Sequence, residues 1–363
     1  MIGHPNAERG EMYADTCSVF LFRQKGMQLA DLWQQEFLDG AKSRTFEALE
    51  WLNRTTLDII GQAAFGDDIN SLDHPETPLR EAYRLVFSFD VGSHIMHGLQ
   101  AFFPASKSIP SKMNKDMEAS RSIITKEANR IVESKYQEAN LDAKDIMSRI
   151  VRDNEAAKGT GNQLSFERMR DQVMTFLGAG HDTTATGVAW TLHLLARHPE
   201  IQSKLRDEIR EYFPDFFDLD FRKSIVEQCD NYDVDQLPYL DNVCKESLRY
   251  IPPIPMTVRE LKDDDRLGGY FVPKGTTVYV LANTINRLPQ YWGDRANEFD
   301  PDRWDNLPST YTTNAYMTFL QGTRGCIGRK FAETEMKVIM CCLLSLFEFS
   351  PRMDMKDPAE QKM

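Results

Sequence analysis

The sequence predicts a mainly α-helical protein with a small β region in its C-terminal third. Apolar residues recur at helical spacing along most of the chain, whereas residues 266–283 alternate β-branched and aromatic side chains between glycine and proline turns. The chain has 363 residues, 41% of them hydrophobic and 27% charged, which is enough to bury a large core. This length favours one large domain or two medium ones.

The first expected helix covers residues 49–65, where Leu52, Ile59 and Ile60 recur at helical steps and Gly66 follows as a stop signal. Residues 111–154 form a charged, amphipathic helical region, for which a solvated face is the better interpretation. Residues 158–164 read as a loop, and residues 165–197 as one long apolar helix.

Three further helices are expected toward the C-terminus. One starts at Pro199, because proline is tolerated in a first helical turn. A shorter helix includes residues 240–250 and stops before Pro252. The last runs from about Gly328 to Phe347, after the strands and a series of loops.

Charge and cysteine usage exclude several classes of function. A net charge of −12 without a basic stripe argues against nucleic-acid binding. The six cysteines have neither zinc-knuckle spacing nor the density of a disulfide framework, so a reducing compartment fits best. No segment approaches about 18 consecutive apolar residues, so we expect no membrane span in this chain, and its start lacks the apolar region of a signal peptide.

The strongest chemical signal is FLQGTRGCIG at residues 319–328. Cys326 lies in a glycine-rich turn just before a predicted helix, so backbone amides and the positive helix end can face a thiolate. Gly322 and Gly328 let the backbone approach a flat group, and Arg324 can pair with a carboxylate. A cysteine taken alone is more often a small buried apolar residue.

A second signal, AGHDTT at residues 179–184, lies inside the long helix. Gly178 and Gly180 each cost roughly 1 kcal/mol relative to alanine in a helix interior and therefore need a reason. The Thr183 hydroxyl can compete for the carbonyl of Ala179 and open the helix locally, with Asp182 beside it. Alone, this pattern is equally compatible with a Gly/Thr kink in a buried helix.

Two further patterns involve arginine. Glu246 and Arg249 lie on one helix face, and such a pair is usually a weak surface salt bridge. Pro301-Asp302-Arg303-Trp304 forms a turn farther along the chain, and Arg259 follows a proline-rich loop, where an arginine is usually a surface charge.

Together these motifs resemble those of the cytochrome P450 family of haem-thiolate monooxygenases, in the same order and spacing. The pattern Phe-x-x-Gly-x-Arg-x-Cys-x-Gly is complete, and the resemblance runs from about Phe46 to Phe349. The sequence around the motifs is most similar to that of fungal microsomal members.

The resemblance implies a role for each motif. Cys326 would be the axial ligand of haem b, held in a loop shaped by Phe319, Gly322 and Gly328. Arg324 would face a haem carboxylate, and Arg259 would reach a propionate. Asp182 and Thr183 would manage protons for dioxygen, with His181 given no role. Glu246, Arg249 and Arg303 would form a buried structural network.

The same resemblance implies a reaction and its partners. One oxygen atom from O2 would enter an apolar small-molecule substrate, in fungal secondary metabolism, with electrons from NADPH-cytochrome P450 reductase. The full-length parent would lie at the cytoplasmic face of the endoplasmic reticulum, while this chain reads as cytoplasmic. Arg329, Lys330 and Lys337 form either a solvated helix face or a basic docking patch for an acidic redox partner.

The ends of the chain depart from the family pattern. The resemblance implies a single haem-thiolate domain over residues 1–363. We expect its fold to be incomplete, without the N-terminal anchor, first sheet and early helices, and ending before the last C-terminal strands. A truncated, non-catalytic product with impaired haem binding is therefore one alternative. A haem-thiolate isomerase or dehydratase is another, although Asp182 and Thr183 count against it. A nicotinamide enzyme is excluded because Gly178 and Gly180 lie inside a helix without the required third glycine.

Overall fold

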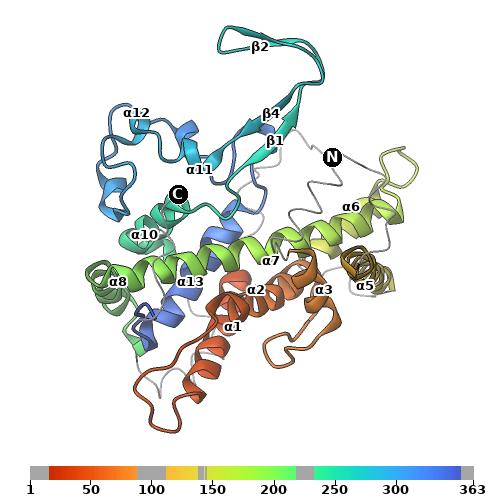
Figure 1. Cartoon of the computed structure of the whole chain (residues 1–363). Coiled ribbons are helices and arrows are strands. Elements are labelled where there is room, and N and C mark those ends of the chain that lie inside the picture. The colour runs from red at the N-terminus through yellow and green to blue at the C-terminus, as the bar shows by residue number, and fades with distance from the viewer. Residues whose placement is uncertain (1–15, 88–111, 138–142, 144, 218–232, 353–363) are drawn as a thin grey trace. The chain divides into compact units, whose positions relative to one another are not determined.

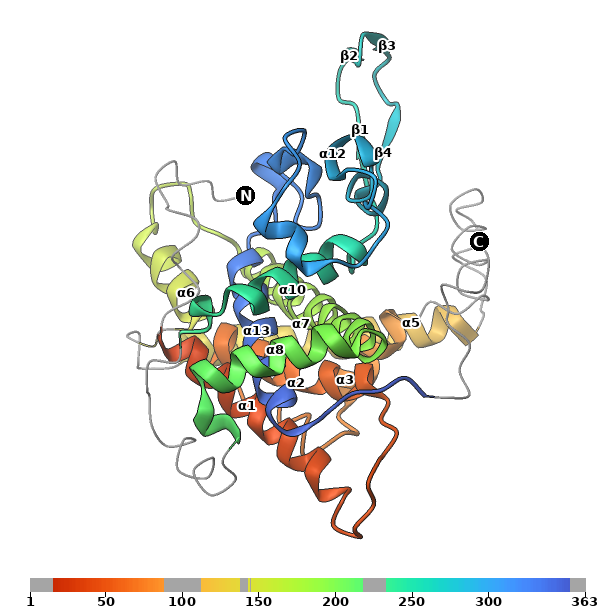
Figure 2. The same ribbon diagram turned by 90° about the vertical axis from the view of Figure 1, so that its left-hand side faces the viewer.

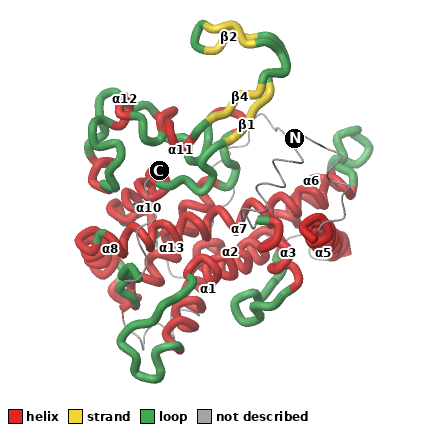
Figure 3. The backbone as a smooth tube through the Cα atoms, viewed as in Figure 1, coloured by secondary structure: helices red, strands yellow, loops and turns green. Residues whose placement is uncertain are grey.

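The computed structural model describes residues 16–87, 112–137, 143, 145–217 and 233–352 (Figure 1). The mainly helical prediction is confirmed: in the described part of the chain helices dominate, and strands are confined to residues 257–280 (Figure 3). The chain divides into two compact units, Asn53–Asp182 and Met1–Leu52 with Thr183–Met363. The divisions fall inside two helices, α2 (Ala48–Phe65) and α7 (Phe166–Arg197). Whether residues 1–363 act as a single domain stays a prediction.

The unit Asn53–Asp182 contains most of α2, together with α3 (Pro78–Val86), α5 (Lys112–Gln137), α6 (Ile146–Ala156) and the first half of α7. The stop predicted at Gly66 is confirmed, because α2 ends there and the glycine adopts φ +62°. Asp145 caps α6 by accepting the Ser148 amide at 2.9 Å. Its carboxylate also accepts from buried Lys135 at 3.1 Å, which ties α6 to α5.

Where the structure describes the predicted helical region 111–154, it contains two helices, α5 and α6. The solvated-face interpretation of it was incomplete, because α5 buries a stripe that includes Ile124, Ala128 and Ile131. Most of the charged residues of α5 lie on the opposite, solvent-facing side of the helix.

Close helix packing accounts for Gly180 of α7. A Cβ atom at this position would lie 2.7 Å from Cγ1 of Ile60 on α2. At Gly178 the same atom would meet the Tyr83 and Phe87 rings at 3.5 and 3.6 Å, which is ordinary contact. Gly180 is therefore needed for α2 and α7 to approach, whereas Gly178 is not.

In the other unit, α1 (Thr16–Gln35) packs along α13 (Arg329–Leu346). A Cβ atom at Gly26 of α1 would lie 3.0 Å from the Cys342 sulfur of α13. α13 is buried along most of its length, and residues 338–345 are buried without a break. The predicted final helix is thus confirmed to within one residue at each end, whereas α1 was not foreseen.

The same unit contains α8 (Pro199–Tyr212), which begins at Pro199 as predicted. It also contains α10 (Pro238–Tyr250), which includes the predicted residues 240–250 and begins two residues earlier. Short helices complete it: η2 (Pro214–Phe217), η3 (Val234–Gln236), α11 (Ala282–Ile285), α12 (Pro289–Trp292), η4 (Pro301–Asp305), η5 (Thr313–Ala315) and η6 (Gly322–Arg324).

The β region is one long antiparallel hairpin with two paired segments. β1 (Thr257–Glu260) pairs with β4 (Thr277–Val280), and β2 (Asp265–Leu267) pairs with β3 (Tyr270–Val272) at the far end of the hairpin (Figures 1 and 2). The strands after Arg266 were predicted, but β1 was not. Tyr270 is 80% exposed, so the tip adds little to the core.

Among the residues that the structure describes, no helix is long and apolar enough to cross a membrane.

Candidate functional site

The Cys326 loop is short, closed by backbone hydrogen bonds and exposed to solvent. The Cys326 amide donates to the Phe319 carbonyl at 2.8 Å and the Gly325 amide to the Gly322 carbonyl at 3.0 Å, which closes the turn. Gly322 has φ +72°, where a side chain would be strained. Residues 321–327 are all exposed, and a Cβ atom at Gly322 or Gly328 would meet nothing within 4 Å. Cys326 therefore lies in an exposed loop whose flanking glycines leave open space beside the backbone.

The sulfur also has a backbone donor. Partial burial raises the pKa of the Cys326 thiol, and a hydrogen bond from the Gly328 amide acts in the opposite direction. Gly328 is the N-cap residue of α13, so this amide belongs to the donor-rich end of that helix. An exposed thiol with a backbone N–H directed at it, beside uncrowded glycines, fits the axial thiolate of a haem.

The two arginines expected at haem carboxylates both lie on the surface of the unit that contains Cys326. Arg324 is exposed on η6, two residues from the cysteine. Arg259 is exposed on β1, where its Nη1 donates to the Thr257 hydroxyl and the Val258 carbonyl, each at 2.8 Å. Neither arginine pairs with a carboxylate among the described residues, so their charges suit an anionic group such as a propionate.

Asp182 and Thr183 are adjacent, half-buried residues in the middle of α7. Burial raises the pKa of the Asp182 carboxyl, while the neighbouring His181 acts to lower it. A carboxyl of this kind can carry a proton nearer to neutral pH than an exposed one.

His181, which received no role from the sequence, is buried within the unit Asn53–Asp182. Its Nδ1 lies 2.6 Å from the Leu177 carbonyl, and its own carbonyl accepts from the Thr56 hydroxyl of α2 at 3.0 Å. Its ring meets the Tyr83 ring edge-on, with centroids 5.2 Å apart. Burial lowers the pKa of the imidazole, which favours the neutral form. His181 thus acts as a packing residue that joins α2 and α3 to α7.

A cavity of about 570 Å³ opens beside this packing, within the same unit. Its apolar wall is made by residues of α3, α5 and α7 and by the residue that follows α3: Tyr83, Phe87, Met113, Met117, Met174 and Gly178. Aromatic and thioether side chains suit an apolar ligand, and the unbranched methionines can adjust to its shape.

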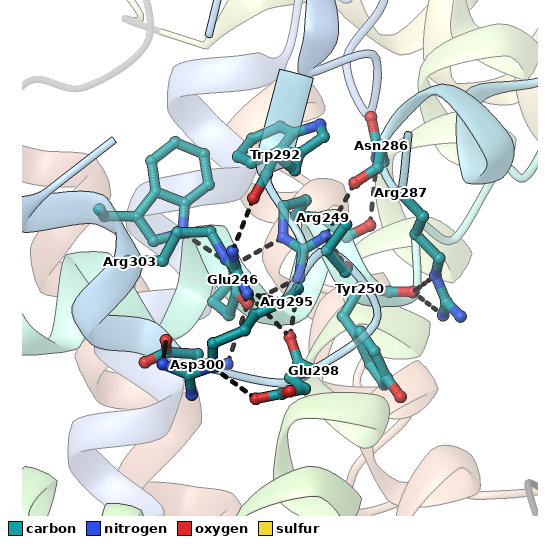
Figure 4. Close-up of polar contacts among 12 residues, drawn as sticks. Glu246, Arg249, Tyr250, Asn286, Arg287, Trp292, Arg295, Glu298, Asp300 and Arg303 are labelled. Carbon is teal, nitrogen blue, oxygen red and sulfur yellow. Dashed lines mark hydrogen bonds and ion pairs between the residues drawn. The ribbon is translucent and has the colours of Figure 1, made fainter. Parts of the chain in front are cut away.

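Glu246, Arg249 and Arg303 meet in a buried cluster, shown in Figure 4. Arg249 contacts both carboxyl oxygens of Glu246, at 2.7 and 2.8 Å, and Arg303 approaches one of them at 3.4 Å. The Asp300 amide and the Trp304 indole also donate to Glu246, at 3.0 and 3.1 Å. The carboxylate is thus surrounded by donors from α10 and η4.

The two guanidinium groups also organise the loops between α11 and η4. Arg249 donates to backbone carbonyls of Asn286, Ala296 and Glu298, while Arg303 donates to those of Trp292, Arg295 and Glu298 (Figure 4). These bonds give hydrogen-bond donors to loop carbonyls, among them those of the buried residues Asn286, Trp292 and Ala296.

Asn286 extends this cluster toward the cysteine loop and was missed in the sequence. Its side-chain oxygen accepts from the Met317 amide at 2.7 Å, and its nitrogen donates to the Thr318 hydroxyl at 3.0 Å. The Thr318 hydroxyl in turn donates to the Leu248 carbonyl at 2.8 Å. Phe319 follows directly, so this chain of bonds fixes where the cysteine loop begins. A single asparagine after a short helix gave no signal of this role.

The basic docking patch proposed for Arg329, Lys330 and Lys337 is wrong. Lys337 is buried and bonds to Asp241 and Asp235, at 2.7 and 2.9 Å. Lys330 also pairs with Asp235, and Arg329 pairs with Glu333 at 2.9 Å. These cations neutralise acids of the same chain rather than form a surplus of positive charge.

Comparison with known proteins agrees with this geometry. The sequence matches the family model for cytochrome P450 over residues 19–363. It is 32% identical to the cytochrome P450 monooxygenase sphH of Aspergillus fumigatus, over 91% of this chain and 61% of that protein. It is 31% identical to the cytochrome P450 monooxygenases FUM15 of Gibberella moniliformis and ALT8 of Alternaria alternata, each over 84% of this chain and 57% of the relative.

The chain spans between 57% and 61% of the length of these three relatives. The family match nevertheless covers all four motifs, from AGHDTT to the Cys326 loop. The chain therefore belongs to the cytochrome P450 family.

Proposed function

We propose that the protein is a haem-thiolate monooxygenase that inserts one oxygen atom from O2 into an apolar organic substrate. The observation that carries the proposal is Cys326 itself, an exposed residue in a loop whose glycines leave open space, with its sulfur accepting from the Gly328 amide. A haem bound there would supply the dioxygen chemistry, and the cysteine thiolate would donate electron density to its iron. Binding would release the thiol proton, since only the thiolate is a good ligand.

The roles of the other residues follow from their positions. Arg324 and Arg259 would bind the haem propionates through charge-assisted hydrogen bonds. The Asp182 carboxyl, whose pKa is raised by burial, would pass a proton to the Thr183 hydroxyl. Glu246, Arg249 and Arg303 would hold the loops that precede the cysteine and would contact neither substrate nor haem.

The substrate proposal rests on the cavity lined by Tyr83, Phe87 and three methionines. Its volume of about 570 Å³ lies within the range typical of small-molecule sites. The apolar lining favours a largely hydrocarbon or aromatic substrate. A role in fungal secondary metabolism, NADPH-cytochrome P450 reductase as the electron donor and an endoplasmic-reticulum address for the parent protein remain parts of this proposal.

Isotope labelling would test the proposed reaction. The haem-supplied protein, NADPH-cytochrome P450 reductase and ethylbenzene, as an apolar probe whose hydroxylated product keeps the inserted oxygen, would be incubated under 18O2. We expect products that contain one labelled oxygen atom, and a Thr183→Ala variant that consumes NADPH with less product per electron pair. Oxygenated products without the label, whose oxygen would then come from water, or a variant with unchanged coupling, would contradict the assigned roles.

A further inference from the structure

The cavity of about 570 Å³ in the unit Asn53–Asp182 has two charged side chains in its wall. Glu118 and Arg121 of α5 lie three residues apart and line it together with Met113 and Met117 of the same helix. Both charged residues are exposed to solvent, whereas Ile124, which follows them in the same wall, is only 5% exposed. The apolar wall of the cavity thus ends at two charged, solvent-exposed side chains.

Glu118 and Arg121 do not pair with each other, although their spacing on the helix allows it. Glu127 and Arg130, farther along α5, have the same spacing and contact each other at 2.7 Å. Within the part of the chain that the structure describes, neither Glu118 nor Arg121 makes a hydrogen bond or an ion pair. The pair beside the cavity therefore keeps both of its charges available to a ligand.

These two charges decide which head group of a ligand is favoured at this end of the cavity. A molecule with only a carboxylate would be attracted by Arg121 and repelled by Glu118, and for a molecule with only an ammonium group the signs are reversed. A head group that carries both charges would meet an opposite charge at each. The guanidinium can donate two parallel hydrogen bonds to a carboxylate, and Glu118 can accept from an ammonium group.

The spacing of the two residues fits a small head group of this kind. Residues three apart on a helix have Cβ atoms about 5–6 Å from each other, so their charged ends can meet over one ligand group. An α-amino acid carries its carboxylate and its ammonium group on a single carbon atom. Its two charges can therefore contact both side chains at once, while an attached hydrocarbon chain enters the apolar part of the cavity.

We propose that the cavity binds a zwitterionic amphiphile, an α-amino acid with a long hydrocarbon chain, whose carboxylate binds Arg121 and whose ammonium group binds Glu118. The hydrocarbon chain would lie along Met117 toward Gly178, four residues before Asp182 on α7. That this molecule is the substrate rests on the proposed function, but its binding requires no haem. Glu118 and Arg121 would determine specificity and take no part in the oxygen chemistry.

Isothermal titration calorimetry at pH 7 tests the recognition, with the whole chain before and after haem is supplied. Four probes with the same chain length would be compared below their micelle concentrations: 2-aminododecanoic acid, dodecanoate, dodecylamine and dodecanol. We expect 2-aminododecanoic acid to bind several-fold more tightly than each of the other three. The preference should not be larger, because water screens charges at an exposed site.

Two substitutions separate the contributions of the charges. Arg121→Gln should weaken the binding of 2-aminododecanoic acid and dodecanoate several-fold and strengthen that of dodecylamine. Glu118→Gln should weaken the binding of 2-aminododecanoic acid and dodecylamine and strengthen that of dodecanoate. The matched controls Arg130→Gln and Glu127→Gln make the same changes on α5 at residues that do not line the cavity, and they should leave all four affinities unchanged. Circular dichroism would confirm that the variants keep their helices.

Three results would overturn the inference: no binding of 2-aminododecanoic acid to the wild type, equal affinities for the four probes, or equal effects of the cavity and control substitutions. Incubation of the haem-supplied protein with its reductase, NADPH and 2-aminododecanoic acid under 18O2 distinguishes this inference from the proposed function. We expect one labelled oxygen atom on the alkyl chain. Selective binding without labelled product would contradict the proposed function and leave recognition by Glu118 and Arg121 intact. Labelled product from ethylbenzene without selective binding would overturn only the inference.

Discussion

Arg249 and Glu246 form a bidentate ion pair. Nη2 and Nε of the arginine lie 2.7 and 2.8 Å from the two carboxyl oxygens of the glutamate. Neither side chain is exposed to solvent. The sequence spacing of three residues is that of an ordinary surface pair on a helix, yet this pair lies at the centre of a cluster that orders the loops before the cysteine. The effect of this pair on the stability of the fold is set by its burial rather than by its sequence spacing.

Removing one member of this pair should be strongly destabilising. Glu246→Ala leaves the Arg249 and Arg303 charges buried without a counter-ion, which typically costs about 3–5 kcal/mol. Urea denaturation followed by circular dichroism would measure the loss. The matched control is Glu298→Ala, which removes the exposed partner of Arg295 and should cost less than about 1 kcal/mol. Equal losses in the two variants would show that the cluster is not buried as described.

The pH dependence of stability should report the pKa of Glu335, a buried residue of α13 whose carboxyl pKa is raised by burial well above its usual value. Between the usual carboxyl value of 4.5 and the higher pKa in the folded protein, the unfolded chain is ionised at this residue and the folded one is not. Folding then binds a proton, so its stability falls as pH rises, by about 1.4 kcal/mol per pH unit. Below pH 4.5 Glu335 is neutral in both the folded and the unfolded chain and does not lower the stability of the fold.

Glu335→Gln should remove this loss, so its advantage over the wild type should grow with pH between 4.5 and the raised pKa of the folded protein. Denaturation midpoints of both proteins across this range would measure it. A constant difference between them would mean that Glu335 has an ordinary pKa.

The two glycines before Asp182 should respond in opposite directions to the same substitution. Gly180→Ala places a methyl group 2.7 Å from Ile60, and such overpacking costs about 1–3 kcal/mol. Gly178→Ala meets only ordinary contacts and gains helix propensity, up to about 1 kcal/mol. Combining Gly180→Ala with Ile60→Ala should recover part of the loss. Thermal unfolding of the four proteins would show whether helix packing is the reason for Gly180.

Cysteine accessibility should single out Cys326. Of the cysteines whose side chains the structure describes, Cys326 is exposed, while Cys244, Cys341 and Cys342 are buried. Brief alkylation of the native haem-free protein, followed by peptide mass mapping, should modify Cys326 much faster than these three. Because its pKa is raised, the rate should still be rising above pH 9. Supplying haem should protect the residue, and equal labelling with and without haem would argue against ligation.

How well the sequence predicted the structure depended on the range of the interactions involved. The ends of α2 and α13 and the length of α7 follow from local periodicity, proline and Gly66, so these were predicted closely. The helix α1 was missed because its function in the fold is to cover α13, more than 300 residues along the chain (Arg23 lies 319 positions before Cys342). Its own sequence has only a weak amphipathic pattern.

The same distinction holds for the site. The Cys326 loop is a local motif and could be recognised from the sequence of residues 319–328 alone. The pairing of Lys337 with Asp235, 102 residues away, could not, and this is why the basic-patch prediction failed. Glu335 carried no signal at all, because a glutamate at this place in a helix is distinguished only by what surrounds it in three dimensions.

The central claim, thiolate ligation of a haem by Cys326, is tested most directly by the carbon monoxide difference spectrum of the reduced, haem-supplied protein. The account predicts a strongly red-shifted Soret band in the wild type that disappears in Cys326→Ser, while Cys244→Ser retains it. A wild type that binds haem without this band, or a Cys326→Ser variant that keeps it, would contradict the claim.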